Sequence, residues 1–124
     1  MSEINTLILL ETFMASHTCT IRDYSVITDV SLSELFETDL LSIHSLTECN
    51  LEHFQSDSLL LLNQPEQQHY PRARFAYTDA GIFTLASLIK TKRAIRIYVK
   101  LIELLVNRLQ GKAYEIASTY QSDK

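Results

Sequence analysis

Residues 74–109 read RFAYTDAGIFTLASLIKTKRAIRIYVKLIELLVNRL, and this stretch decides the fold. It begins with the apolar-aromatic run Phe75–Tyr77, after which Thr78 or Asp79 offers a helix start. No proline interrupts the rest, and Gly81 falls in the first turn, where a glycine costs least. Apolar residues then recur every three or four positions, which predicts a helix with one apolar face. The residues of that face are Ile82, Leu85, Ala86, Leu88 and Ile89.

A second helix is expected from about Ala94, after the polar interruption Lys90–Arg93. One apolar stripe of this helix holds Ile95, Tyr98, Val99, Ile102, Leu105, Val106 and Leu109. The other stripe holds Ile97, Leu101 and Leu104, and the remaining polar ribbon holds Arg93, Arg96, Lys100, Glu103 and Asn107. A helix that is apolar most of the way round is buried on two sides, either by a neighbouring element or by another copy. We favour a homodimer, with an interface of Ile95, Tyr98, Ile102, Leu105 and Leu109.

The chain length of 124 residues suits one domain, which we place at residues 1–112, followed by a tail at 113–124. No apolar run is long enough to span a membrane, and Met1–Glu3 lacks the basic start of a secretory signal. Cys19 and Cys49 have no C-x-x-C spacing, so we expect two buried, reduced thiols in a cytoplasmic protein.

Charge is divided unevenly along the chain. Residues 1–71 carry one basic and eleven acidic residues, a net charge of −10, whereas residues 72–112 carry nine basic and two acidic residues, a net charge of +7. Such asymmetry points to a polyanionic partner. It would also arise if the two halves simply packed against each other, and the sequence does not separate these explanations.

The sequence of the first half of the chain predicts short strands and helices. Thr18–Asp29 favours two strands with a turn at Arg22-Asp23, and Ser31 with Glu34 forms a capping-box pattern for a short helix. A longer helix is expected over Leu40–Phe54, which makes a helix-turn-helix-like pair with the short one.

The segments before and after these elements add further helix, strand and loop predictions. Ile4–Met14 suits a strand or helix on the core, and Ser58–Leu62 suits a buried strand. Asn63–Pro71 contains two prolines and is expected to be a mobile surface loop, and Gly111 fits the end of the last helix. The fold class predicted is a small α+β domain with short strands and two C-terminal helices.

Catalytic and metal-binding patterns are weak. Cys49 and His53 would share a helical face, but a metal site needs at least three ligands. The chain has two glycines and no phosphate-binding glycine loop, and no nucleophile has a local signature. We therefore expect no enzyme activity, no cofactor and no metal.

A dense group of basic residues is the more specific feature, and part of it flanks a helix N-terminus, which attracts anions. Its members are Arg72, Arg74, Lys90, Lys92, Arg93, Arg96 and Lys100. Tyr70, Phe75 and Tyr77 lie beside the arginines in the sequence. The alternative interpretation is a solvated face with the aromatic residues in the core.

Several motifs of this chain together resemble a known family. Thr78–Ile82, Leu85 and Thr91–Ile95 are similar to the pattern "F-T-E-Q-G-V … M-L-S … S-E-R-A-I". Upstream, "T-I-R … V … D … L-A-x-L-Y" is matched by Thr20–Arg22, Val26, Asp29, Leu32, Leu35 and Phe36. Asn50–Phe54 resembles "N-I-E-R-F", and "D-F-x-F-x-L" is matched by Asp57, Leu60 and Leu62. Over residues 18–109 the order and spacing resemble the open-reading-frame-six N-terminal domain, related to the KilA-N and Bro-N domains of phage antirepressors.

The resemblance implies a DNA-binding domain of a phage- or prophage-derived regulator, often fused to a C-terminal effector domain. In the helix that ends at Phe54, the family usually has basic residues where this chain has Leu41, Glu48, Cys49 and His53. A carboxylate at Glu48 would repel a phosphate.

Two functional hypotheses follow. The first is a transcription regulator of the phage or mobile-element type that binds DNA as a dimer, with Arg93, Arg96 and Lys100 on phosphates and the other basic residues around them. The second is an antirepressor or decoy that has lost DNA contact and binds a repressor, or another DNA-binding protein, through its acidic half.

Overall fold

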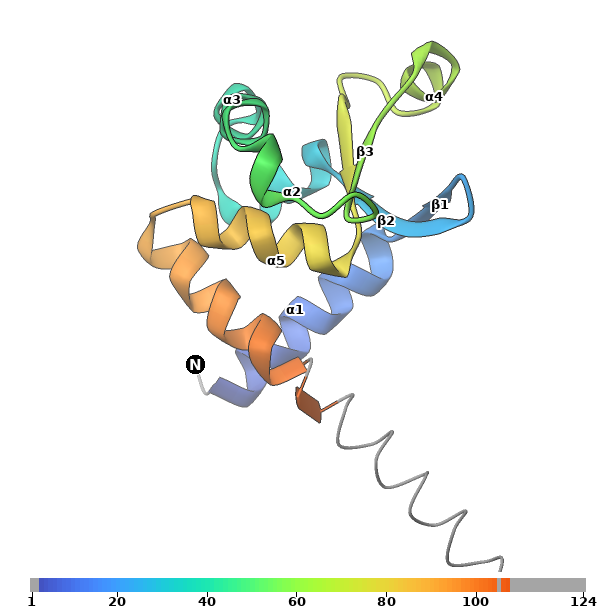
Figure 1. The fold of residues 1–124 in the computed structure, drawn as a ribbon. Helices are drawn as coiled ribbons and strands as arrows, with labels where there is room; N and C mark the ends of the chain where they lie inside the picture. Colours follow the sequence, from blue (N-terminus) through green and yellow to red (C-terminus); the bar gives the residue numbers. More distant parts are fainter. Residues whose placement is uncertain (1–2, 105, 108–124) are drawn as a thin grey trace, which may run out of the picture.

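A computed structural model of the protein describes residues 3–104, 106 and 107, and it shows helices packed around a small sheet (Figure 1). The first elements are α1 (Glu3–His17), β1 (Cys19–Ile21), β2 (Tyr24–Thr28), α2 (Asp29–Phe36), α3 (Leu40–Cys49) and the 3-10 turn η1 (Leu51–His53). Then come β3 (Leu59–Leu61), α4 (Gln64–His69), β4 (Phe75–Tyr77), α5 (Asp79–Leu88) and a last helix over residues 92–104. The predicted α+β class is confirmed.

The four strands form one antiparallel sheet in the order β1-β2-β4-β3. Arg22 and Asp23 join β1 to β2 and both have positive φ, at 52° and 69°. A two-residue turn with positive φ at both positions matches the right-handed twist of a hairpin. The hairpin predicted with its turn at Arg22-Asp23 is therefore confirmed.

The two faces of the sheet contribute to two apolar clusters. Ile27, Phe75 and Tyr77 join the main core, which takes residues from α1, α2, α3, α5 and the last helix. Val26 and Ala76 belong to a smaller cluster on the other face. In Figure 1, α5 runs between α3 on one side and α1 with the last helix on the other. None of the described helices is both long and apolar enough to cross a membrane.

Two helix boundaries differ from the prediction. The α2 helix begins at Asp29, because the Thr28 hydroxyl, and not that of Ser31, accepts the bond from a first-turn N–H. The helix expected over Leu40–Phe54 ends at Cys49 and is followed by η1, which leaves Leu51 exposed and Phe54 buried.

The segment Asn63–Pro71 was expected to be a loop, and this was wrong for most of it. Asn63 and Glu66 form a capping box and a proline occupies the first turn, so Gln64–His69 forms a helix. Arg22 then donates two bonds to the Glu66 carboxylate, at 2.9 and 2.7 Å. This pairing lowers the pKa of Glu66 from 4.5 to about 2.

Three more predictions concern the N-terminal segment, the start of α5 and the C-terminal end of the chain. Ile4–Met14, for which strand and helix were both possible, lies within α1, and Met14 is buried in the core. Thr78 caps α5 as predicted. The expected helix end at Gly111 and the tail at 113–124 lie outside the described residues.

Gly81 allows the start of α5 to approach β3 closely. The Ser58 carbonyl accepts bonds from the Thr78 N–H at 3.1 Å and the Thr78 hydroxyl at 3.3 Å. A Cβ at Gly81 would lie 2.1 Å from that carbonyl oxygen, which is far inside van der Waals contact. The cost of glycine in a helix is thus offset by a close packing that a residue with a Cβ would prevent.

We predict that Gly81→Ala lowers the free energy of unfolding by about 2–4 kcal/mol, because Ser58 and α5 must move apart. Urea denaturation followed by circular dichroism measures it. Ala80→Gly, at the adjacent exposed position of α5, is the control and should cost no more than about 1 kcal/mol. Equal stability of Gly81→Ala and the wild type would show that the approach of Ser58 is not obligatory.

Candidate nucleic-acid interface

The Asp29 carboxylate fixes the backbone that carries two of the predicted DNA contacts, Arg72 and Arg74. Its Oδ2 atom accepts bonds from the backbone N–H groups of Arg74, at 3.0 Å, and Phe75, at 3.1 Å. The same oxygen lies 2.6 Å from Nε2 of His44, on α3. A buried carboxylate with three donors holds the α4–β4 loop against α2 and α3.

Arg74 is held by an acidic residue of the first half of the chain. Its guanidinium lies 3.0 Å from a carboxylate oxygen of Glu48, and both side chains are about half exposed. Glu48 belongs to α3. The pair therefore offsets charge on both residues at this surface, where a single exposed ion pair adds little stability.

The Arg93 side chain binds the C-terminal end of α2. Its Nε donates to the Leu35 carbonyl at 2.7 Å, and its Nη1 lies 3.5 Å from the Glu37 carboxylate. Leu35 lies in the last turn of α2, where carbonyl groups lack partners within the helix. Arg93 thus joins the last helix to α2.

Lys100 is also engaged within the fold. The residue is buried, and its ammonium group lies 3.4 Å from each carboxylate oxygen of Glu103. Lys100 lines a hollow of about 630 Å³ between α1, α2 and the last helix, together with Phe13, Glu34 and Arg93. It is not a freely exposed phosphate contact.

Six of the seven basic residues are exposed, and four of these are not among the engaged residues described above: Arg72, Lys90, Lys92 and Arg96. Within the described part of the chain, no hydrogen bond or ion pair engages these four side chains. Lys90, Lys92 and Arg96 are close in sequence, where α5 gives way to the last helix, and we call them the basic corner. Arg72 follows α4, which lies at the other side of the molecule in Figure 1.

Thr91 gives the basic corner its local structure. Its hydroxyl accepts the Ala94 N–H at 3.1 Å, and its carbonyl accepts the Ile95 N–H at 3.0 Å, so it caps the last helix. Lys92 and Arg96 are four residues apart and lie on one side of that helix. The corner thus combines three cations with the positive end of a helix.

The last helix buries one of its apolar stripes and exposes the other. Ile97, Leu101 and Leu104 lie in the core. Ile95, Val99, Ile102 and Val106 are between 39% and 59% exposed, and we call them the exposed stripe. Of the other predicted interface residues, Tyr98 packs on Phe83 of α5 with ring centroids 4.5 Å apart. Leu105 and Leu109 lie outside the described residues.

Two of the three aromatic residues near the arginines are core residues. Phe75 and Tyr77 are buried, and the Tyr77 hydroxyl lies 2.7 Å from that of Thr47. Burial raises the pKa of Tyr77. The Phe75 and Tyr77 rings are not surfaces on which bases stack, as the alternative interpretation expected, whereas Tyr70 is only partly buried against the smaller cluster.

The cysteine prediction was partly wrong. Both thiols are free, but Cys49 is exposed on α3 and Cys19 is only half-buried. A hydrogen bond with the Cys19 thiol raises the pKa of Tyr70. Among the residues the structure describes, no three His, Cys, Asp or Glu side chains gather as ligands for a metal.

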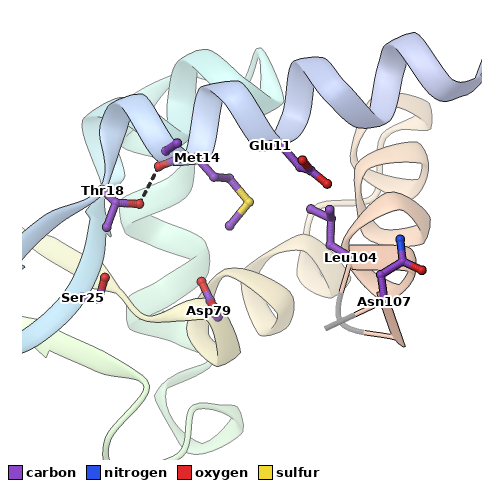
Figure 2. Close-up of a pocket in the computed structure, with 8 residues that line it drawn as sticks. Glu11, Met14, Thr18, Ser25, Asp79, Leu104 and Asn107 are labelled. Carbon is purple, nitrogen blue, oxygen red and sulfur yellow. Dashed lines mark hydrogen bonds between the residues drawn. The ribbon is translucent and has the colours of Figure 1, made fainter. Parts of the chain in front are cut away.

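A second hollow, of about 590 Å³, has the wrong charge for a polyanion. Figure 2 shows Glu11 and Met14 from α1 facing Leu104 and Asn107 of the last helix, with Asp79 at the start of α5. Two carboxylates on this wall would repel phosphate groups. The basic corner is therefore the stronger candidate surface.

Comparison with protein-family models, with curated proteins and with solved structures finds no match.

We predict that Arg93→Ala lowers the free energy of unfolding by about 1 kcal/mol, because it removes the bond to the Leu35 carbonyl. Lys92→Ala, which removes a neighbouring exposed charge that has no partner among the described residues, should change it by less than about 0.5 kcal/mol. Chemical denaturation of the two variants side by side measures the difference. If both variants unfold at the same denaturant concentration, Arg93 does not hold α2 in solution.

Proposed function

We propose that this chain is a DNA-binding regulatory protein of the phage or mobile-element type that contacts the duplex through the basic corner and acts as a dimer through the exposed stripe. The observation that carries the proposal is the basic corner itself. Its three cations, Lys90, Lys92 and Arg96, are exposed and have no partner among the described residues.

The chemistry of the corner suits phosphate groups. The first N–H groups of a helix have no partner within it, and the helix dipole adds positive charge at the same end. Lys90 precedes this end, whereas Lys92 and Arg96 extend from its first turns. Three such cations and a helix N-terminus favour a polyanion over a neutral ligand.

The candidate site is smaller than the sequence predicted. Arg74, Arg93 and Lys100 are engaged with Glu48, with Leu35 and with Glu103, so we assign them to the fold. Arg72 is exposed but distant from the corner, and we leave it out of the contact surface.

The helix-turn-helix-like pair supports a different role for α3. No lysine or arginine lies between Arg22 and Arg72, so α2 and α3 bring no positive charge to a phosphate backbone. Sequence-independent affinity for DNA depends on such charges. We therefore propose the basic corner, and not α3, as the surface that contacts DNA.

One observation favours the alternative function, an antirepressor or decoy that binds a repressor or another DNA-binding protein. Leu41, on the outer face of α3, is 74% exposed and lies in the same helix as the acidic residue Glu48, and Leu51 is exposed beyond it. Exposed apolar residues among acidic ones suit a basic protein partner. No catalytic role is proposed.

We predict that replacing Lys90, Lys92 and Arg96 by alanine weakens DNA binding and makes its salt dependence shallower. Each lost phosphate contact should reduce the slope of log affinity against log salt by about 0.9. Fluorescence anisotropy with a labelled duplex between low and physiological salt measures both quantities. The fold should persist, because these side chains are exposed.

The matched comparison is Lys92→Ala against Arg72→Ala, since each removes one exposed cation. The proposal expects a loss of affinity for Lys92→Ala only. Equal losses would mean that net charge, and not the corner, governs binding. A wild type that binds no duplex even at low salt would exclude the DNA function and leave the protein-interaction function in its place.

A further inference from the structure

We propose that the exposed stripe pairs with the same stripe of a second copy of this chain, with the two helices antiparallel. In this pairing Arg96 of each copy reaches Glu103 of the other, and both basic corners come to one face of the dimer. The inference rests on the proposed function, because it specifies the dimer and the symmetry of its DNA contact.

The stripe has the spacing of a helix–helix contact. Its residues Ile95, Val99, Ile102 and Val106 follow at intervals of four, three and four, so they form one line along the helix. The core stripe of Ile97, Leu101 and Leu104 points into the domain and leaves this line uncovered by the described residues. A line of exposed branched aliphatic side chains is typical of a surface that pairs.

Charge along the helix selects the antiparallel direction. One flank of the stripe carries Lys92 and Arg96 toward its N-terminus and Glu103 toward its C-terminus. In a two-fold antiparallel pair, the same flank of both helices meets in opposite directions, so cations face the carboxylate. In a parallel pair this flank would instead face the opposite flank of the second copy, so Arg96 would not meet Glu103, and the aligned helix dipoles would also oppose it.

Glu103 is available for this contact. Its side chain is 43% exposed, and its bonds to Lys100 of the same copy are long, at 3.4 Å. A carboxylate accepts several hydrogen bonds at once, so it can take the guanidinium of Arg96 as well. The guanidinium has five N–H groups and can bridge this carboxylate to a phosphate.

The register follows from the stripe. If Ile95 faces Val106 and Val99 faces Ile102, Arg96 lies about 3 Å along the axis from the level of Glu103 of the second copy, at 1.5 Å per residue. The two Lys92 residues are then about 25 Å apart along the pair, and the two Arg96 residues about 14 Å. Both separations are within one turn of B-DNA, which is about 34 Å, so one duplex can contact both corners.

Charge reversal tests the pairing without DNA. Arg96→Glu and Glu103→Arg should each raise the dissociation constant of the dimer roughly tenfold in sedimentation equilibrium. Each change places like charges opposite each other where the two helices pair. The double variant Arg96→Glu/Glu103→Arg should return to within about threefold of the wild type. Single variants that dimerise like the wild type, or a double variant as weak as the singles, would overturn the inference.

Disulfide trapping tests the direction. In a Cys19→Ala/Cys49→Ala background, we expect an Ile95→Cys protein mixed with a Val106→Cys protein to give a crosslinked dimer under mild oxidation. Neither protein alone should crosslink, because equivalent residues near the helix ends are far apart in an antiparallel pair. Self-crosslinking of the Ile95→Cys protein would show a parallel pair, and a monomer at tens of micromolar would show that this stripe is not the seam.

The two proposals fail separately. A dimer with the expected crosslink that binds no DNA would keep this inference and remove the DNA function. A monomer that binds DNA through Lys90 and Lys92 would keep that function and remove the antiparallel pair.

Discussion

The fold depends on one buried carboxylate, that of Asp29, which joins three elements at a single oxygen. Oδ2 accepts from the backbone of Arg74 and Phe75 at the start of β4 and lies 2.6 Å from the His44 ring of α3. Asp29 is itself the first residue of α2 and is completely buried. Within the described residues its Oδ1 has no hydrogen-bond partner, so all of the pairing passes through one atom. A network of this kind specifies one arrangement of its elements, because leaving any buried donor without a partner is costly.

Ion pairs between the two halves of the chain account for part of the uneven charge. Arg74 and Arg93 come from the basic second half of the chain, and their partners Glu48 and Glu37 come from the acidic first half. Some of the opposite charges of the two halves therefore pair with each other where the halves pack together. The three cations of the basic corner have no ion pair with the acidic half among the described residues. The corner adjoins the exposed stripe on the last helix, which links the proposed DNA contact to the proposed dimer.

Some elements could be predicted from the sequence because the residues that form them are adjacent in the chain. The turn at Arg22-Asp23 and the cap at Thr78 could be read from a few adjacent residues. The short helix α4 also had a local signal, the capping box of Asn63 and Glu66, which the two prolines of the segment outweighed in the prediction, and an ion pair from Arg22, 44 positions away, adds to it. The role of Arg93 depends on a carbonyl 58 positions away. Helical periodicity identified both stripes of the last helix but not which of them faces the core.

We propose that DNA contacts the basic corner and not the helix-turn-helix-like pair. Amide chemical-shift mapping during titration with a short duplex at low salt tests it most directly, because every backbone N–H from Lys90 to Arg96 and along α3 is a separate probe. We predict that the shifts gather at residues 90–96, with α3 unchanged. Shifts that gather on Leu40–Cys49 while the corner stays unchanged, or no shifts at all, would contradict it.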